Sequence, residues 1–338
     1  MTTKNNPWLW ATAGIGAIIA VRALARQQNK YSFQNKVVVI TGGSRGLGLV
    51  LARQLAAEGA LLAICARTEE QLKKAEQELT ERGGEVLAIP GDVTNRVQAE
   101  QFIQRVIKYY GRIDVLINNA GIIQAGPLAD MTLADFEEAI NTHFWAPLYT
   151  MWTTIPHMKE RGQGRIINIA SVGGKVSIPH LVPYSASKFA LVGLSNGFRQ
   201  ELKKDGILVT TVNPGLTRTG SNRNIKVKGQ SEKEYAWFTT VGASLLISSA
   251  VEKTARKIID ACRYGEAEVL TNFPAKILAL ANNVLPELTS DMLSLTNKIL
   301  PEENGNEINS RGYENESDLI PDYLQNRASR AAQENNEI

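Results

Sequence analysis

The stretch VVVITGGSRGLG, residues 37–48, decides the fold of this chain. Its first four residues are apolar and mostly β-branched, which is typical of a strand buried on both faces of a parallel sheet. Gly42, Gly46 and Gly48 follow in the spacing G-x-x-x-G-x-G, and a helix-forming run occupies residues 49–57. This order of strand, glycine turn and helix predicts a dinucleotide site. Glycines let the backbone approach a pyrophosphate closely, and the helix N-terminus attracts its negative charge.

Strand-like and helix-like runs alternate from residue 31 onward. The expected strands are residues 37–40, 61–66, 86–89, 113–117, 165–169, 207–212 and 267–270. The expected helices are residues 49–57, 69–82, 98–110, 132–161, 183–204 and 252–263. Regular alternation of this kind predicts an α/β fold with a Rossmann-like, doubly wound parallel sheet, whose ligand binds at the carboxyl ends of the strands.

The charges of the chain are balanced overall but unevenly distributed. Its 338 residues include 37 Lys and Arg against 34 Asp and Glu, which argues against a nucleic acid or another polyanion as partner. No acidic residue precedes Glu58, whereas nine acidic residues and three arginines follow Pro301. The two cysteines, Cys65 and Cys262, have no metal or redox spacing, and we expect Cys65 in the core.

An uncharged run rich in Trp, Ala, Ile and Gly occupies residues 8–21, and arginines follow it. A helix extended to residue 25 is about 27 Å long, close to the roughly 30 Å hydrocarbon core of a bilayer. We therefore expect residues 1–30 to anchor the chain in a membrane, through residues 8–25, with the catalytic part on the cytoplasmic side. Two alternatives remain open: a signal peptide cleaved after residue 25, and a hydrophobic arm packed on the domain or on a second subunit of a cytoplasmic protein.

Tyr184 and Lys188 are the side chains best placed for acid–base chemistry. They stand four residues apart in an expected helix and therefore lie on one face, one turn from each other. An ammonium beside a phenol favours the phenolate, so we expect Lys188 to lower the pKa of Tyr184 from its usual value near 10. Ser171 ends the preceding strand and could hydrogen-bond a substrate oxygen from the other side. On spacing alone, however, such a pair is more commonly a solvated helix face.

Further motifs accompany this pair at the ends of the expected strands. Together they are Thr41-Gly42-x-x-x-Gly46-x-Gly48, Asp92, Asn118-Asn119-Ala120-Gly121, Asn141, Ser171, Tyr184-x-x-x-Lys188, and Pro214-Gly215 with Thr219. The set resembles the short-chain dehydrogenase/reductase family in its compact form, over about residues 36–273. The resemblance implies a Rossmann catalytic domain, which we place at residues 31–273.

The resemblance also implies catalytic roles for four residues. Tyr184 would deliver or accept the proton, and Lys188 would hold the nicotinamide ribose while tuning that tyrosine. Ser171 would orient the substrate carbonyl. Asn141 would bind a water molecule that links Lys188 to solvent. A metal is not part of this pattern, and the three histidines of the chain lack metal spacing.

The family pattern assigns the cofactor-binding residues in the same way. Asp92 would contact the adenine, Asn118 would position the nicotinamide side, and Thr219 would bind the carboxamide. The residues expected to bind the cofactor are Gly42, Ser44, Arg45, Gly46, Leu47, Gly48, Arg67, Asp92, Val93, Asn118, Ala120, Gly121, Tyr184, Lys188, Pro214, Gly215 and Thr219.

The end of the second strand indicates which nicotinamide cofactor is used. A carboxylate there would bind the adenosine ribose hydroxyls of NAD and repel a 2′-phosphate. This chain has Arg67 at that place, and Arg45 in the glycine loop is a second cation within reach. Arginines suit a phosphate through charge-assisted, fork-shaped hydrogen bonds, so we expect NADP(H), with NAD(H) as the alternative.

The chain after residue 273 divides into two parts. Apolar residues recur at steps of three and four around Pro286, which predicts an amphipathic helical pair at residues 274–300. This pair could cover the active site, join a homodimer, lie on a membrane or simply pack on the domain. The Asn- and Glu-rich residues 301–338 should bury little and form a flexible tail, with a short helix near residues 322–332.

These observations favour an enzyme that moves a hydride between NADP(H) and a secondary alcohol or ketone of small-molecule size. The apolar residues between Val172 and Pro183 favour an apolar substrate. Two functions of other classes remain as alternatives. One is a non-catalytic regulator that binds NADPH, and the other is a membrane-tethered scaffold.

Overall fold

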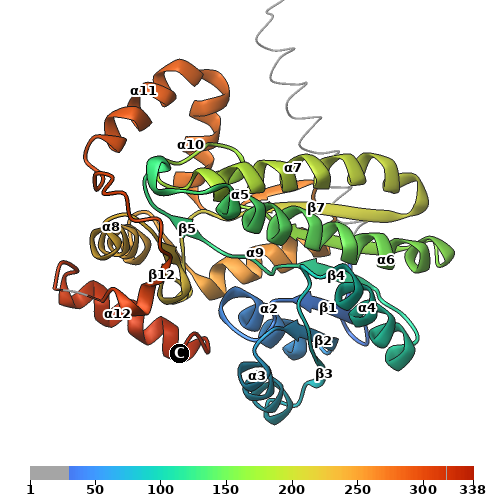
Figure 1. The fold of residues 1–338 in the computed structure, drawn as a ribbon. Coiled ribbons are helices and arrows are strands. Elements are labelled where there is room, and N and C mark those ends of the chain that lie inside the picture. Colours follow the sequence, from blue (N-terminus) through green and yellow to red (C-terminus); the bar gives the residue numbers. More distant parts are fainter. Residues whose placement is uncertain (1–29, 317) are drawn as a thin grey trace, which may run out of the picture.

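A seven-stranded parallel sheet forms the centre of the computed structural model, which describes residues 30–316 and 318–338 (Figure 1). The order of its strands is β11-β7-β6-β4-β1-β2-β3. Their bounds are β1 (Val37–Thr41), β2 (Leu61–Ala66), β3 (Glu85–Pro90), β4 (Val115–Asn118), β6 (Gly164–Ile169), β7 (Ile207–Asn213) and β11 (Glu268–Leu270). The chain runs from β1 outward to β3 and then returns to the other side of β1 at β4. The ends of β1 and β4 therefore border the crevice where such sheets bind their ligands.

Helices cover both faces of this sheet, and the two faces have separate cores. The helices α2 (Gly46–Ala57), α3 (Glu69–Glu81) and α9 (Val251–Arg263) pack on one face. The helices α4 (Arg96–Tyr110), α6 (Ala146–Glu160) and α7 (Val182–Leu202) pack on the other. Within β1, Val38 and Ile40 point to the first core, whereas Val37 and Val39 point to the second. The doubly wound α/β fold expected from the sequence is confirmed, and Cys65 lies in the core as expected.

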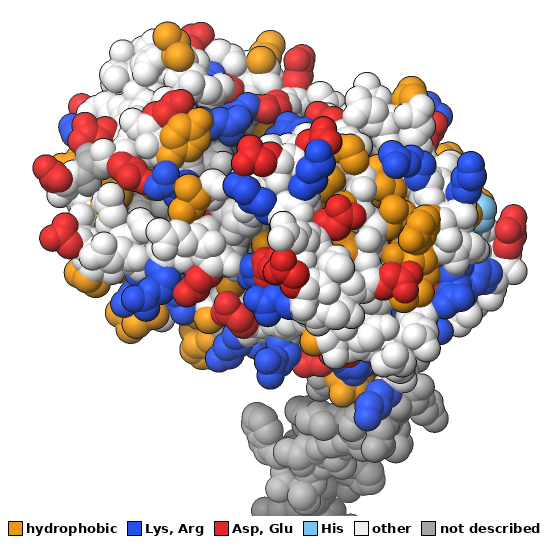
Figure 2. All heavy atoms as spheres, turned by 90° about the horizontal axis from the view of Figure 1, so that it is seen from below, with side chains coloured by type: hydrophobic (Ala, Val, Ile, Leu, Met, Phe, Trp, Pro, Cys, Tyr) orange, Lys and Arg blue, Asp and Glu red, His pale blue; other side chains and the backbone are white. Residues whose placement is uncertain are grey.

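Shorter elements complete the catalytic part. They are η1 (Leu128–Asp130), η3 (Val172–Gly174), η4 (Lys203–Asp205), β8 (Thr217–Arg218), η5 (Ser221–Asn224), α8 (Ser231–Ala243) and β10 (Ser249–Ala250). Charges of both signs are intermixed on the face that Figure 2 shows. This mixture agrees with the balanced composition of the chain.

The long helical region expected at residues 132–161 is present, and a π turn divides it into three consecutive pieces. They are α5 (Leu133–Ile140), the π-helix η2 (Asn141–Trp145) and α6. Pro147 explains the interruption, since a proline has no N–H to donate to the carbonyl four residues earlier. The N–H of Ala146 instead reaches the carbonyl of Asn141, five residues back. Such π turns are frequent at functional sites.

The expectation that the tail beyond Pro301 buries little is wrong. Ile320, Leu324 and Ala332 are at most 5% exposed, and the helix α12 (Asp322–Glu334) packs against α8. The strand β12 (Ser310–Arg311) pairs with β9 (Lys226–Val227), which in turn pairs with β5 (Gln124–Ala125). The composition is polar, but its few apolar side chains gather on one side and dock. The helix expected near residues 322–332 is confirmed.

The helical pair before this tail is present as α10 (Phe273–Val284) and α11 (Pro286–Asn297). Helix α10 buries Ala275 and Ala279 against the domain, whereas α11 buries only Thr289 and stands out from the body (Figure 1). No helix within the described part of the chain is long and apolar enough to cross a membrane. The expected anchor at residues 1–30 lies outside the described residues apart from its last position, so it stays a prediction.

A buried carboxylate joins the start of β1 to the segment before β4. Asp114 is 2% exposed and accepts hydrogen bonds from the N–H of Val37 (2.9 Å), from Nε of Arg112 (3.0 Å) and from Nη2 of Arg161 (2.9 Å). Burial would raise the pKa of Asp114, but these hydrogen bonds outweigh it and hold the pKa below its usual value.

We expect Asp114→Asn to lower the free energy of unfolding by about 2 kcal/mol at pH 7, because it weakens charge-assisted hydrogen bonds to a buried group. The contribution of the carboxylate is present above its unfolded-state pKa near 4 and is lost as the pH falls through the lower folded-state pKa. The difference from wild type should therefore shrink in acid. Urea unfolding at a series of pH values measures it. The control substitution Asp291→Asn, at an exposed position, should lower the free energy of unfolding by less than about 0.5 kcal/mol. An equal loss in both variants would contradict the assignment.

Candidate active site

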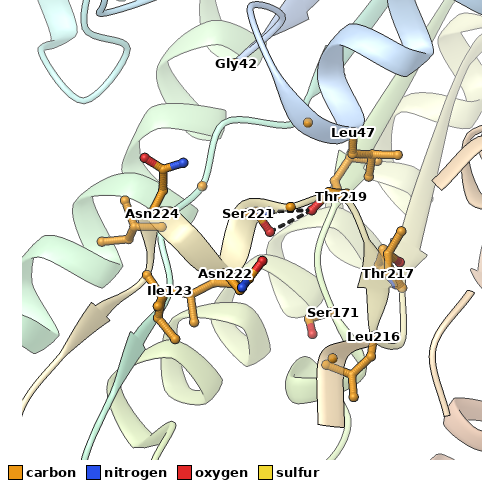
Figure 3. A pocket seen from close by; sticks show the side chains of 18 of the residues that line it. Gly42, Leu47, Ile123, Ser171, Leu216, Thr217, Thr219, Ser221, Asn222 and Asn224 are labelled. Carbon is orange, nitrogen blue, oxygen red and sulfur yellow. Dashed lines mark hydrogen bonds between the residues drawn. The ribbon is translucent and has the colours of Figure 1, made fainter. Parts of the chain in front are cut away.

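A cavity of about 770 Å³ opens at the carboxyl ends of the central strands. It brings together most of the residues that the sequence assigned to catalysis and cofactor binding. Those that line it are Gly42, Ser44, Arg45, Gly46, Leu47, Arg67, Asp92, Val93, Ala120, Gly121, Ser171, Tyr184, Lys188, Pro214, Gly215 and Thr219. Figure 3 shows Leu47 and Thr219 beside each other, with Ser171, Asn222 and Asn224 elsewhere around the same cavity.

The glycine loop lies directly against the loop that follows β4. Gly42 has φ +66°, and a Cβ atom added to it would lie 2.9 Å from the Cα of Ala120. The hydroxyl of Thr41 accepts hydrogen bonds from the N–H groups of Asn119 (3.0 Å) and Ala120 (3.1 Å). Only glycine fits this backbone conformation and this close approach without strain.

Gly48 and Asn119 hold the two loops together, and Asn119 also lines the cavity. Gly48 does not line the cavity, and an added Cβ there would collide with the carbonyl oxygen of Gly42. Its role is close packing of α2 against the loop. The side-chain amide of Asn119 donates to the carbonyls of Thr41 (3.1 Å) and Gly42 (3.0 Å). The sequence motif contained Asn119, but we assigned it no role.

The structure contradicts a direct cofactor role for the side chain of Asn118. This side chain is 3% exposed and lies between strands. Its Nδ2 donates to Oδ1 of Asn168 (2.9 Å), and its Oδ1 accepts from the hydroxyl of Thr150 (2.6 Å). Because all these partners are buried, Asn118 ties β4 to β6 and α6 and does not reach the cavity.

Ser171, Tyr184 and Lys188 meet at the inner end of the cavity. Ser171 follows β6, and its Oγ accepts from the N–H of Gly173 (3.0 Å). Tyr184 and Lys188 occupy the first two turns of α7, as their spacing predicted. The Nζ of Lys188 lies 5.6 Å from the centroid of the Tyr184 ring and donates to the carbonyl of Ile169 (2.9 Å).

Burial controls the pKa values of this pair. It raises the pKa of Tyr184, and a hydrogen bond with Ser171 lowers it only in part. It lowers the pKa of Lys188 to about 7. The pKa of Tyr184 is therefore raised and not lowered as expected, because desolvation disfavours the charged form of both groups. The phenol stays protonated at neutral pH and can act as a proton donor.

His143 supports the tyrosine from the side. Its ring meets the Tyr184 ring edge-on, with centroids 5.4 Å apart. Nε2 of His143 accepts from the N–H of Ile122 (3.2 Å), so Nδ1 carries the proton and donates to Oγ of Ser187 (2.7 Å). Burial lowers the pKa of His143 well below its usual value and keeps it neutral. His143 also lines the cavity.

Asn141 is the one predicted catalytic residue that the structure does not bring to the cavity. Its side chain is exposed and does not line the pocket. Its carbonyl accepts from the N–H of Ala146 within the π-helix η2. The expectation that Asn141 binds a water molecule stays a prediction, and its backbone carbonyl at the π turn is the group that this structure offers for it.

The outer end of the cavity holds the groups expected near the adenosine. Arg67 is exposed after β2, and Asp92 accepts from the N–H (2.9 Å) and hydroxyl (2.8 Å) of Thr94. Nη1 of Arg45 lies 3.3 Å from Oε2 of Glu337. Sequence reasoning missed Glu337, which we placed in a flexible tail, and no local pattern around it could have indicated the contact. Burial raises the pKa of Glu337 to about 7 against the opposing effect of Arg45.

The remaining wall of the cavity is mainly apolar. The side chains of Ile123, Leu216, Trp237, Phe238 and Leu278 contribute to it. Residues of the segments 172–183 and 216–237 contribute to this wall. Ala120 and Gly121 of the β4 loop were expected at the cofactor, and Ile123 of the same loop lines the cavity beside them. Leu278 comes from α10, for which covering the active site was one of the alternatives left open.

Comparison with known proteins agrees with this site. The family model for short chain dehydrogenases matches residues 36–229. The ketoacyl reductase HetN of Nostoc sp. is 36% identical over 226 residues, which cover 67% of this chain and 78% of that protein. The 11-beta-hydroxysteroid dehydrogenase-like 3 protein of Arabidopsis thaliana is 33% identical over 255 residues, which cover 75% of this chain and 78% of that protein.

A solved structure agrees as well. A blue fluorescent protein from a metagenomic library, in complex with NADPH, is 30% identical with a TM-score of 0.60. The match covers 72% of this chain and 98% of that one. The chain therefore belongs to the short chain dehydrogenase family and is an NAD(P)-dependent oxidoreductase that acts on CH–OH or carbonyl groups.

Proposed function

We propose that this protein moves a hydride between NADP(H) and the ketone or secondary alcohol group of an apolar small molecule. One observation carries the proposal. A single cavity holds Ser171, Tyr184 and Lys188 at its inner end and the glycine loop at its outer end. The glycine loop fits the pyrophosphate of a dinucleotide, because Gly42 and Gly46 adopt positive φ values that let the backbone turn tightly at the N-terminus of α2.

The reduction would proceed through the buried polar groups. Hydrogen bonds from the hydroxyls of Ser171 and Tyr184 hold the carbonyl oxygen of the substrate. When bound, the nicotinamide ring supplies the hydride. Tyr184 gives its proton to the substrate oxygen, which is feasible because burial keeps the phenol protonated. The buried Lys188, one turn along α7, stabilises the negative charge that Tyr184 then carries. Oxidation of the alcohol uses the same groups in reverse.

The preference for NADP(H) rests on two arginines. Arg45 and Arg67 both line the outer end of the cavity, and Arg67 occupies the position where a carboxylate would favour NAD(H). Guanidinium groups bind phosphate through paired, charge-assisted hydrogen bonds. A related solved structure in complex with NADPH supports this choice.

The substrate class rests on the apolar wall of the cavity and on the relatives. Trp237, Phe238 and Leu278 present apolar side chains to the cavity. Cavities lined mainly by apolar side chains bind mainly apolar ligands. Relatives named as a ketoacyl reductase and as a hydroxysteroid dehydrogenase-like protein support a carbonyl or CH–OH group on an apolar molecule. A purely regulatory NADPH-binding role is less favoured, because it needs the glycine loop but not the buried Ser171, Tyr184 and Lys188.

Tyr184→Phe should lower kcat about a thousandfold or more, because a phenyl ring has no proton to donate. Ser171→Ala should lower it about a hundredfold, the typical cost of one lost hydrogen bond to the reacting oxygen. Both variants should keep the Kd for NADPH close to wild type. The measurements are NADPH oxidation with a panel of hydrophobic ketones and NADPH titration. The exposed controls Tyr109→Phe and Ser177→Ala should behave as wild type. A fully active Tyr184→Phe variant would contradict the mechanism.

Arg67→Asp should shift the ratio of kcat/KM for NADP(H) over NAD(H) toward NAD(H) by about tenfold or more, the scale of one charge-assisted hydrogen bond. The new carboxylate would repel the 2′-phosphate and accept from the ribose hydroxyls. Arg256→Asp makes the same charge change on the exposed side of α9 and should leave the ratio unchanged. An unchanged ratio in both variants would assign the selection to Arg45 or another group.

We also propose that residues 1–30 hold the enzyme at a membrane without contributing to the site. The support is the uncharged run at residues 8–21 with its tryptophans and flanking arginines. Deleting residues 1–30 should move the protein from the membrane pellet to the supernatant and leave the Kd for NADPH unchanged. Carbonate extraction separates a spanning helix, which resists it, from an interfacial one. A full-length chain that stays in the supernatant without detergent would overturn the anchor.

A further inference from the structure

The last described residues of the chain lie across the glycine loop. We call residues 334–338 the strap. The N–H of Gly46, at the first position of α2, donates to the carbonyl of Asn335 (2.8 Å). The side-chain amide of Asn336 donates to the carbonyls of Ser44 (2.9 Å) and Gln71 (3.0 Å). The strap thus satisfies backbone groups at the place where this fold binds a pyrophosphate.

The carboxylate of Glu337 occupies the centre of this contact. It is 6% exposed. Oε2 lies 3.3 Å from Nη1 of Arg45 and accepts from Nδ2 of Asn224 (2.7 Å). Oε1 lies over Gly46, so that a Cβ atom added to that glycine would collide with it. An acidic side chain therefore already sits on the helix N-terminus beside the cation that we assign to a phosphate.

The strap bridges the two walls of the cavity. On one wall the strap contacts the glycine loop. On the other wall, the side-chain amide of Asn335 donates to the carbonyl of Thr219 (3.4 Å), and the side chain of Glu337 accepts from Nδ2 of Asn224. Figure 3 shows Thr219 and Asn224 within the segment that faces the glycine loop. Asn336 has φ +55°, a left-handed turn that Asn tolerates better than most residues and that aims Glu337 inward.

Helix α12 leads into the strap and has contacts of its own with the body of the protein. Leu324 and Ala332 are buried, and α12 packs on α8. Arg53 fixes the point where helix and strap meet. It donates to the carbonyl of Glu334 (2.8 Å) and to Oδ1 of Asn335 (3.1 Å) while paired with Glu78 (2.7 Å). Movement of the strap alone would uncover the loop and leave the α12 contacts in place.

We propose that the strap is an intramolecular ligand of the phosphate-binding loop, and that the dinucleotide has to displace it in order to bind. This inference rests on the proposed function of the same cavity. Exclusion has two physical causes. The carboxylate of Glu337 and the carbonyl of Asn335 occupy the space and the N–H group that the pyrophosphate would use. The carboxylate of Glu337 and a phosphate bound next to it would also repel each other, and both would compete for Arg45.

Competition between the strap and the dinucleotide lowers the apparent affinity for the dinucleotide without changing the intrinsic affinity of the open site. The apparent Kd equals the intrinsic Kd divided by the fraction of molecules whose loop is open. A strap that is docked in nine molecules of ten would weaken dinucleotide binding about tenfold. The strap would thereby set the dinucleotide concentration at which the enzyme becomes loaded.

The test compares four proteins. They are the full-length wild type, a chain truncated after Gln333, the full-length variant Glu337→Ala, and the full-length control Glu334→Ala. The side chain of Glu334 is exposed, and only its backbone carbonyl contacts Arg53, so the control removes an acidic side chain of the strap without touching the loop. Calorimetric titration with NADPH and with NADH, at one pH and ionic strength, gives the Kd values. Thermal unfolding of each form establishes that it is folded.

We expect the truncated chain to bind about tenfold more tightly than wild type, with Glu337→Ala between them and Glu334→Ala unchanged. Hydrogen exchange provides a second readout that does not need turnover. Adding NADPH to the full chain should accelerate amide exchange in a peptide covering residues 333–338, because the displaced strap loses its hydrogen bonds. A ligand that simply rigidified the protein would slow exchange there.

Three results would overturn the proposal, and they differ from one another. Equal Kd values in the truncated and full chains would mean that the strap does not compete. Weaker binding after truncation, together with slower exchange on adding NADPH, would mean that the strap closes over the bound dinucleotide. If neither the full nor the truncated chain binds NADPH or NADH, the proposed function itself is wrong and the strap proposal falls with it.

Discussion

The close approach of the backbone after β1 to the backbone after β4 is the constraint on which the site depends. Gly42 lies against Ala120 with no room for a side chain, and the hydroxyl of Thr41 accepts from two N–H groups of the neighbouring loop. The amide of Asn119 closes the contact from the other direction. These interactions join the two loops at the point where the strand order reverses. The N-terminus of α2 and the cavity floor take their positions from this joint.

Burial then decides the chemistry at the inner end of the cavity. Tyr184 and Lys188 are removed from water, which disfavours the charged form of each, and the result is a protonated phenol beside an amine with a pKa of about 7. Ser171 is held by the backbone turn that follows β6, and neutral His143 fixes the tyrosine ring. The proton donor is therefore prepared by its surroundings before a substrate arrives.

The groups at the outer end of the cavity favour a bound anion but do not distinguish one anionic ligand from another. A helix N-terminus with free N–H groups and a nearby guanidinium attracts any anion of suitable size. In this chain the anion that fills the place is Glu337, brought there by the docking of α12 on α8. The same electrostatics that suit a dinucleotide phosphate thus make the loop available to a carboxylate of the protein itself.

The sequence by itself determined the features that arise from short-range patterns. The strand at Leu61–Ala66, the Rossmann alternation and the meeting of Ser171 with Tyr184 could be predicted, because strand ends in a parallel sheet share one edge. Tertiary structure alone decided the rest. Asn118 turned into the core and Asn141 stayed outside the cavity, since the direction of a side chain depends on the packing around it. The contact of Glu337 with the glycine loop joins residues about 290 positions apart, and no local pattern encodes a contact of that range.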